Sequence, residues 1–597
     1  MDKQDIKWRI DAYRAAMAKA GVAAAILPRT DDHLSEYITS HWHIVRYLSG
    51  FTGSAATLVI TADRALLWTD SRYFLQAADQ LEGTGIELMK DGLVETPDIT
   101  TWICNTLAPG ETVGINGMLM SIDDTATLRT RLTAAGLKLV TDFDPIDLIW
   151  SDRPGLPEDK AFVHDEKYTG ESAASRMGRT LEAARALGAD SFFVAGLDEV
   201  AWILSLRSKD VPHNLPVATS FLYLAPESSV LFIDPAKLTP EVEAHLAEAG
   251  VKTLPYGKVK EFLLALPKEE KVLLSGNRTP VGIADTLEGH FVKADSPVQM
   301  LKAVKNAVQV QGERDAHIRD GVAMVRSLME IKRITDAGEP LTEIEAADII
   351  ERHRREMPLF FDLSFDTISG FGPNGAIVHY SPSKTSNARI EKGSLLLLDS
   401  GANYLDGTTD ITRTIAIGTP TADMRHDFTL VMKGHIAIAT AVFPEGTRGH
   451  QLDAMARMPL WREGKSYLHG TGHGVGHFLS VHEGPQSIRL NDTMAPLTPG
   501  MLTSNEPGIY LSGRYGIRCE NLVLTVPFEE TEFGKFYAFE TLTLCPFDRT
   551  LFDTSIMTAE EIRWVDDYHR RVYETLAPAG LTEPERAWLA EATAPLR

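Results

Sequence analysis

The sequence Leu395-Leu396-Leu397-Leu398-Asp399-Ser400-Gly401 is followed, after a loop that holds Asp406-Gly407, by Thr408-Thr409-Asp410-Ile411-Thr412-Arg413-Thr414. The leucine run predicts a buried strand, and the β-branched segment predicts a second one. The pair predicts a hairpin in which Asp399 can lie opposite Asp410 on one face, because the midpoint between them falls in the loop. Opposed carboxylates repel unless a cation joins them, and a buried ionised carboxylate must be paired or metal-bound. Taken alone, the pair is equally consistent with two solvated loop aspartates.

A glycine-rich segment carries three evenly spaced histidines, in His469-Gly470-Thr471-Gly472-His473-Gly474-Val475-Gly476-His477. Histidines four residues apart are typical of a helical metal motif, but the many glycines disfavour a helix. An extended segment places the three histidines on one face and glycines on the other, where backbone or ligand can approach closely. His482, in Val481-His482-Glu483-Gly484-Pro485, is a further histidine nearby. A strip of this kind is much less often structural than a lone histidine.

Two glutamates follow. Glu506 stands just before a Pro-Gly turn in Thr503-Ser504-Asn505-Glu506-Pro507-Gly508. Glu520 lies in a predicted strand over residues 516–524, where Arg518 shares its face and is placed to orient that carboxylate. Cys519 points to the opposite face, as a small packed residue and not as a ligand or nucleophile. Either glutamate alone would be read as an ordinary surface residue.

Together these motifs supply four carboxylates and one imidazole, from Asp399, Asp410, His473, Glu506 and Glu520. Four negative charges suit two divalent cations, and an oxygen-rich ligand set suits Mn²⁺ better than a thiolate-type zinc site. Two ions about 3.5–4 Å apart can bridge and acidify one water, which makes hydroxide available near neutral pH. The motifs therefore predict a hydrolytic centre with two metal ions.

The amino-acid composition is that of a globular protein. The chain has 597 residues, of which 44% are hydrophobic and 24% charged, as in ordinary globular proteins. Its 59 basic and 82 acidic residues give a net charge of −23, which argues against nucleic acid or an anionic membrane as the main partner. Three cysteines are too few for a disulfide framework. With no signal peptide at the start and no apolar run of about 18 residues, we expect a soluble cytoplasmic protein.

The rest of the chain divides at two places. Trp150–Pro157 contains two prolines and a glycine, which break both helix and strand. A second boundary lies near Val304–Glu313, before a helix whose apolar face is formed by Ile318, Val322, Val325 and Met329. Both N-terminal blocks have an apolar segment followed by two strands, predicted at 56–60 and 65–68 and again at 219–224 and 230–233. This layout indicates two copies of one α/β domain, with chance similarity as the alternative.

In their order and spacing, the motifs resemble those of the pita-bread metallopeptidases, and among these the three-domain aminopeptidase P (Xaa-Pro aminopeptidase) group. The resemblance includes Gly50–Ala55, Asp152–Pro154 and the helical tail from Thr558, and so covers most of the chain. It implies an α/β (α+β) chain with two creatinase-like domains, at 1–155 and 156–310. A pita-bread catalytic domain would occupy 311–597.

The resemblance also implies the role of each site residue. Asp399 binds one metal in bidentate fashion and Asp410 bridges both. His473 and Glu506 bind the other metal, and Glu520 bridges. The non-ligand histidines His379, His469 and His482 hold substrate and stabilise the tetrahedral intermediate. The metals are usually Mn²⁺, and His477 has no role in the family pattern.

The implied reaction is removal of the N-terminal residue from peptides with proline second, by attack of a metal-bridging hydroxide. Glu506 receives the water's proton and passes it to the prolyl nitrogen. Peptides with a free N-terminus would be the substrates, and the family favours a homodimer. Prolidase and methionine aminopeptidase share the catalytic fold, but the roughly 300 residues before the catalytic domain are longer than either normally carries. Creatinase-type members and binding modules lose metal ligands, whereas all five are present here.

Overall fold

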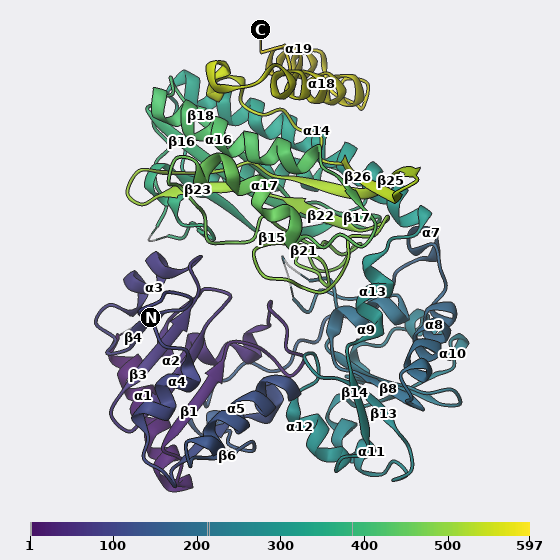
Figure 1. The fold of residues 1–597 in the computed structure, drawn as a ribbon. Helices are drawn as coiled ribbons and strands as arrows, with labels where there is room; N and C mark the ends of the chain where they lie inside the picture. The colour runs from purple at the N-terminus through teal and green to yellow at the C-terminus, as the bar shows by residue number, and fades with distance from the viewer. Residues whose placement is uncertain (1–2, 212, 214, 385, 597) are drawn as a thin grey trace. The chain divides into compact units, whose positions relative to one another are not determined.

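The computed structural model describes residues 3–211, 213, 215–384 and 386–596. It forms two compact units (Figure 1). Unit 1 comprises Met1–His164, Glu171–Val211 and Val217–Val298, and unit 2 comprises Asp165–Gly170, Pro212–Pro216 and Gln299–Arg597. Residues 1, 2 and 597, at the outer ends of the predicted first and last domains, lie outside the described residues.

Unit 1 contains two six-stranded sheets with the same topology. The first runs β4 (Glu87–Lys90), β3 (Ala65–Thr69), β2 (Thr57–Thr61), β1 (Ala24–Pro28), β5 (Thr112–Ile115), β6 (Lys138–Val140). The second runs β12 (Val251–Leu254), β11 (Ser229–Ile233), β10 (Ser220–Leu224), β8 (Ser191–Val194), β13 (Val272–Ser275), β14 (Phe291–Ala294). Parallel and antiparallel pairs also repeat in the same positions. The predicted repeat of one α/β domain is confirmed.

Strands β3, β10 and β11 are buried along their whole length, as their near-continuous apolar sequences require. Helices pack around them; α1, for example, buries Ile6, Ile10, Tyr13 and Met17 at helical spacing. The helices of unit 1 are α1 (Lys3–Ala20), α2 (Ile44–Ser49), α3 (Phe74–Leu81), α4 (Ile99–Thr106), α5 (Ile122–Ala134), α6 (Ile146–Ile149), α8 (Ala173–Ala186), α9 (Leu197–Leu204), α10 (Pro240–Glu248), α11 (Val259–Leu264), α12 (Val281–Ala284). Residues 151–161 form neither helix nor strand, as the prolines there predict.

Unit 2 is built around two four-stranded sheets. In the first, β15 (Phe360–Phe371), β16 (Ser394–Tyr404) and β17 (Gly407–Thr408) are neighbours, and β18 (Ile411–Ile417) pairs with β16. The second runs β19 (Val442–Pro444), β26 (Gly534–Thr541), β25 (Asn521–Thr531), β22 (Leu502–Asn505). Two short pairs complete the unit: β20 (Gly472–His473) with β21 (Ser487–Ile488), and β23 (Gly508–Leu511) with β24 (Tyr515–Arg518).

Helices surround these sheets (Figure 1). They are α14 (Ala307–Ala337), α15 (Glu343–Arg355), α16 (Ala422–Ala439), α17 (His450–Trp461), α18 (Ala559–Leu576), α19 (Glu583–Ala592). The predicted helix before the catalytic motifs is confirmed: α14 begins at a capping box formed by Asn306 and Gln309, and buries Val322 and Val325 in the core. The helical tail is confirmed as well, with Thr558 capping α18.

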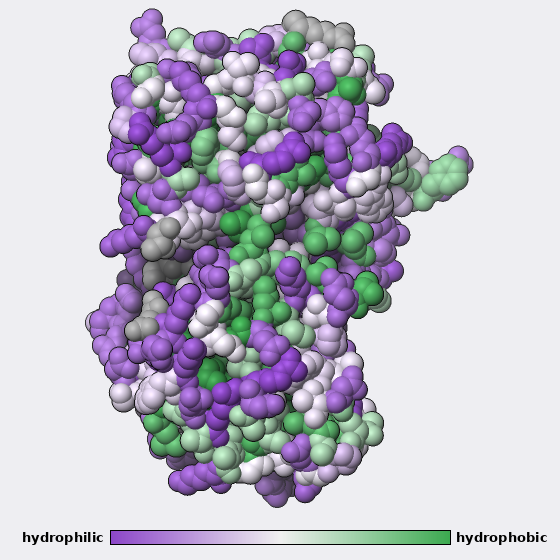
Figure 2. Space-filling view, turned by 90° about the vertical axis from the view of Figure 1, so that its left-hand side faces the viewer, coloured by the Kyte–Doolittle hydropathy of each residue, from purple (hydrophilic) through white to green (hydrophobic). Residues whose placement is uncertain are grey.

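The surface agrees with the composition. Hydrophilic side chains are spread over the face shown in Figure 2. Within the described ranges, no helix combines the length and the apolar character needed to cross a lipid bilayer.

Candidate metal centre

The hairpin that carries Asp399 and Asp410 forms, but with a register different from the one predicted. Asp399 lies opposite Thr412, and Asp410 precedes β18 by one residue. The reason is the turn: Tyr404 pairs with Gly407, so the turn is centred between residues 405 and 406 and not at the midpoint between Asp399 and Asp410. The two aspartates are therefore diagonal neighbours on one face of the hairpin and do not face each other directly.

The glycine–histidine segment is extended over only part of its length. Gly472 and His473 form β20, and no helix is present. Glycine is required here, because a Cβ on Gly472 would lie 1.9 Å from the Ser504 carbonyl oxygen and one on Gly474 would lie 2.0 Å from that of Glu483. The predicted close approach of backbone is thus confirmed.

His477 does not share a face with the other histidines, and that part of the prediction is wrong. The chain leaves the extended conformation after Gly474, and Phe478 has a positive φ of 48°. The His477 ring is buried, with Nδ1 2.9 Å from Glu313 Oε1 and Nε2 3.2 Å from the Tyr168 carbonyl oxygen. It is a partner for a buried carboxylate on α14, which explains why it has no place in the site.

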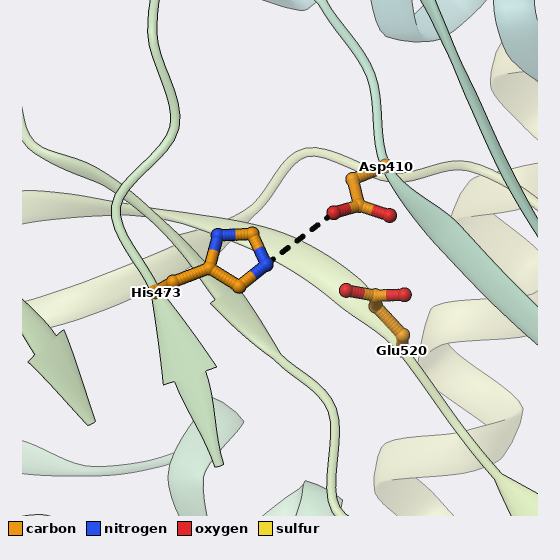
Figure 3. A group of neighbouring side chains, drawn as sticks. All are labelled: Asp410, His473 and Glu520. Atoms are coloured by element: carbon orange, nitrogen blue, oxygen red, sulfur yellow. Dashed lines mark ion pairs between the residues drawn. The ribbon is translucent and has the colours of Figure 1, made fainter. Parts of the chain in front are cut away.

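His473 directs one ring nitrogen at the carboxylates (Figure 3). Its Nδ1 donates to the Gly474 carbonyl at 3.0 Å, which leaves Nε2 as the nitrogen that faces the cluster. Nε2 lies 3.5 Å from Asp410 Oδ2 and 3.3 Å from Glu506 Oε1. Asp410, His473 and Glu520 each offer a ligand atom within 4.8 Å of the others.

Both glutamates lie where the chain changes strand partners. Residues 516–524 do not form the single strand predicted, because the strand is interrupted at Cys519 and Glu520. Before the interruption β24 pairs with β23, and after it β25 pairs with β22. Glu506 occupies the corresponding gap between β22 and β23. This crossing of two strand pairs brings Glu506 and Glu520 to the same place, while Cys519 is packed in the core as expected.

Arg518 orients a different carboxylate from the one predicted. Its guanidinium donates to Asp399 Oδ2 at 2.5 Å and to Thr412 Oγ1 at 3.1 Å. Thr412 in turn donates to Glu520 Oε2 at 2.8 Å, so a hydrogen-bond chain through Thr412 connects Arg518 to Glu520. The charge of Arg518 also lowers the pKa of Glu520 directly, against the larger effect of burial. The sequence reading missed Thr412, although its place in a β-branched strand two residues after Asp410 puts it on the same face.

The other predicted histidines lie around the cluster. The rings of His473 and His482 are 4.4 Å apart, and those of His482 and His379 are 6.3 Å apart. His469 is connected differently: its Nε2 is 2.8 Å from the Tyr510 hydroxyl, which also accepts from Arg518 at 2.7 Å. Tyr510 was also missed. Apart from its position after the Pro-Gly turn, no feature of the sequence indicates that it belongs to the site.

The carboxylates of the cluster are costly to ionise together unless a cation is bound. Burial, and then repulsion from neighbouring carboxylates, raise the pKa values of Asp410 and Glu520 well above the ordinary range. Burial also raises the pKa of Glu506 to about 7, although Arg518 opposes the shift. Among the described residues, Asp399 Oδ1 is buried without a hydrogen-bond partner. An orphaned carboxylate oxygen beside three more carboxylates and an imidazole fits hard divalent cations.

Comparisons with known proteins cover almost the whole chain. Residues 311–527 match the model of metallopeptidase family M24, and residues 535–596 match the C-terminal region of peptidase M24. Residues 9–149 and 152–309 each match a model of the creatinase/prolidase N-terminal domain.

Individual proteins are similar to this chain over nearly its whole length. The probable Xaa-Pro aminopeptidase P of Laccaria bicolor is 41% identical over 609 residues, which is 98% of this chain and 93% of the relative. Aminopeptidase P2 of Arabidopsis thaliana is 39% identical over 615 residues, 96% of this chain and 86% of its own. The crystal structure of an X-prolyl aminopeptidase from Caenorhabditis elegans, described as a cytosolic enzyme with a di-nuclear active site, has 36% identity and a TM-score of 0.96, with 100% of both chains covered.

Proposed function

The chain belongs to metallopeptidase family M24, and we propose that it is an Xaa-Pro aminopeptidase that releases the N-terminal residue from peptides with proline second. One observation carries the proposal. All five residues that the family pattern assigns to metal binding are present, and they lie in one cluster, mostly buried, that draws on distant parts of unit 2. The match also extends over 93% of the Laccaria bicolor relative and 100% of the worm enzyme, and so includes the N-terminal domains.

We propose two divalent ions at this cluster, both Mn²⁺. Asp399 would bind one ion, His473 and Glu506 the other, with Asp410 and Glu520 shared between them. When bound, two such ions lower the pKa of a water towards neutrality and polarise a carbonyl group. The oxygen-rich donor set supports Mn²⁺ over a metal that prefers thiolates.

The side chains of the site supply the remaining steps. Glu506 takes the proton of the attacking water and passes it to the prolyl nitrogen, which carries no hydrogen and is a poor leaving group until protonated. His379 and His482 stabilise the developing oxyanion, and His469 helps hold substrate. The free α-amino group is held at the edge of the carboxylate cluster, which limits cleavage to the first residue.

The wider organisation is part of the same proposal. We infer three domains, at residues 1–155, 156–310 and 311–597, a cytoplasmic location, and a homodimer formed mainly through the catalytic domain. The cytosolic description of the worm enzyme supports the location. Exposed Met455, Met458 and Trp461, three residues apart on one side of α17, support a contact with a second copy, since exposed apolar patches mark interfaces.

A peptide series tests the proposed function. Metal-loaded enzyme is offered peptides that differ in length and in the second residue, and the products are identified by mass. We expect loss of one N-terminal residue when proline is second, in peptides of three or more residues, and no cleavage of the N-acetylated versions.

Three other outcomes would overturn the assignment. Cleavage confined to Xaa-Pro dipeptides would indicate a prolidase, and preferential release of methionine before small residues would indicate a methionine aminopeptidase. A folded, metal-loaded chain that cleaves no peptide would instead be a binding module.

A further inference from the structure

A buried histidine on α16 joins the two segments that carry the glutamates. The β22–β25 pair ends at Asn505 and Asn521, and the β23–β24 pair begins at Gly508 and Arg518. Glu506 and Glu520 therefore lie in the gap between two ladders. His435 reaches this gap: its Nδ1 is 3.1 Å from the Asn505 carbonyl oxygen and 3.1 Å from the Cys519 carbonyl oxygen.

Each of those carbonyls belongs to the peptide bond that leads into a glutamate. The Asn505 carbonyl is in one plane with the nitrogen of Glu506, and the Cys519 carbonyl is in one plane with the nitrogen of Glu520. One ring nitrogen thus restrains the backbone from which both carboxylates project. His435 itself is fully buried, and its ring makes hydrogen bonds to these two carbonyls and to the Asn521 amide.

The hydrogen-bond network around the ring fixes its tautomer. Arg413 donates to Asn521 Oδ1 at 2.8 Å, and a guanidinium can only donate. The amide nitrogen of Asn521 is therefore the atom 3.2 Å from His435 Nε2, which must accept. Nδ1 then carries the proton and donates to the two carbonyls. Burial lowers the pKa of His435 to about 3, so the ring is neutral in this arrangement.

Arg413 holds the other side of the same segment. It donates to the Glu520 carbonyl at 2.6 Å, so the peptide units before and after Glu520 are both restrained. The Asn505 amide returns a bond of 2.9 Å to the backbone carbonyl of His435. Repulsion between clustered carboxylates would otherwise drive the segments apart.

We propose that His435 is a positioning residue of the metal centre, which fixes the spacing of the segments bearing Glu506 and Glu520. The inference rests on the proposed function, because the spacing matters through the ions that these carboxylates hold. Partners of this kind, outside the ligand set, typically cost about 10–100-fold in metal affinity or activity when they are replaced.

Two amide variants separate positioning from packing. In His435→Asn the amide nitrogen stands near the position of Nδ1 and can still donate to the carbonyls. In His435→Gln the same group stands near Nε2 and cannot. His569→Gln is the matched control: His569 is buried on α18, with Nε2 accepting from the Phe547 backbone at 3.1 Å.

Mn²⁺ affinity is measured by titration. Turnover is measured separately, with a peptide that has proline at its second position. We expect His435→Gln to lose about 10–100-fold in Mn²⁺ affinity or kcat with little change in KM, and His435→Asn to keep most of both. His569→Gln should lower only the melting temperature. Equal behaviour of the two His435 variants, or equal losses in His569→Gln, would overturn the proposal.

The metal titration also distinguishes this proposal from the proposed function. If the wild-type chain cleaves no Xaa-Pro peptide, the proposed function fails, while Mn²⁺ affinities of the variants still report on His435. If wild type cleaves and binds metal normally and His435→Gln matches it in both, only the positioning role is wrong.

Discussion

Glu506→Gln is expected to reduce kcat by at least about 10²-fold, the low end for removal of a general acid–base group. Glutamine keeps the size of the side chain and its place beside Ser504, whose hydroxyl donates to Glu506 Oε1 at 3.1 Å. It cannot take a proton from water at neutral pH, so the prolyl nitrogen would leave unprotonated. Steady-state kinetics on a proline-second peptide measure the loss, which is larger if metal affinity also falls.

Exposed Glu530 on β25 provides the control, since Glu530→Gln makes the same chemical change away from the cluster. It should leave kcat unchanged. If the folded Glu506→Gln enzyme turned over at a near-normal rate, Glu506 would be only a turn residue and the proton path proposed here would be wrong.

Asp410→Asn is expected to lower the metal content below two ions per chain and to reduce activity with it. Asp410 is buried and lies within reach of both His473 and Glu520, so a neutral amide there removes a charge that both ions would share. Elemental analysis of the purified, metal-loaded variant gives the number of ions per chain.

The matched control is Asp423→Asn, because the Asp423 side chain is 80% exposed at the start of α16. This variant should bind metal as the wild type does. An unchanged metal count in Asp410→Asn would argue against a shared ligand at this position.

Local pattern was enough to predict the hairpin that carries Asp399 and Asp410 and the repeat in the N-terminal blocks. The leucine run and the β-branched segment after it form the expected hairpin, and the repeated layout of the N-terminal blocks corresponds to two sheets with one topology. These signals are visible because burial imposes a residue pattern on each strand by itself.

The strand register and the side-chain partners could not be predicted, because they depend on residues far away in the sequence. The hairpin register followed the turn at residues 405–406, and the predicted strand over 516–524 broke because β24 and β25 pair with different strands. Arg518 selected Asp399, a carboxylate 119 residues away, over its near neighbour Glu520.

The histidines illustrate the same limit. His477 has the spacing of a site residue, yet it pairs with Glu313, since a buried carboxylate needs a partner. His435 lies in helix α16 and belongs to none of the sequence motifs of the site, yet it contacts the backbone of both glutamate segments. Whether His477 or His435 acts at the site is thus determined by its position in the fold and not by its spacing along the chain.

A metal titration tests the central claim, that the carboxylate cluster works by holding two divalent ions. Chelator-stripped protein is titrated with Mn²⁺ while release of the first residue from a proline-second tripeptide is followed, and bound metal is counted at each step. We predict negligible turnover without metal and a plateau at about two ions per chain, because four clustered carboxylates carry more negative charge than one ion balances. Full turnover by protein that holds no transition metal would contradict the claim.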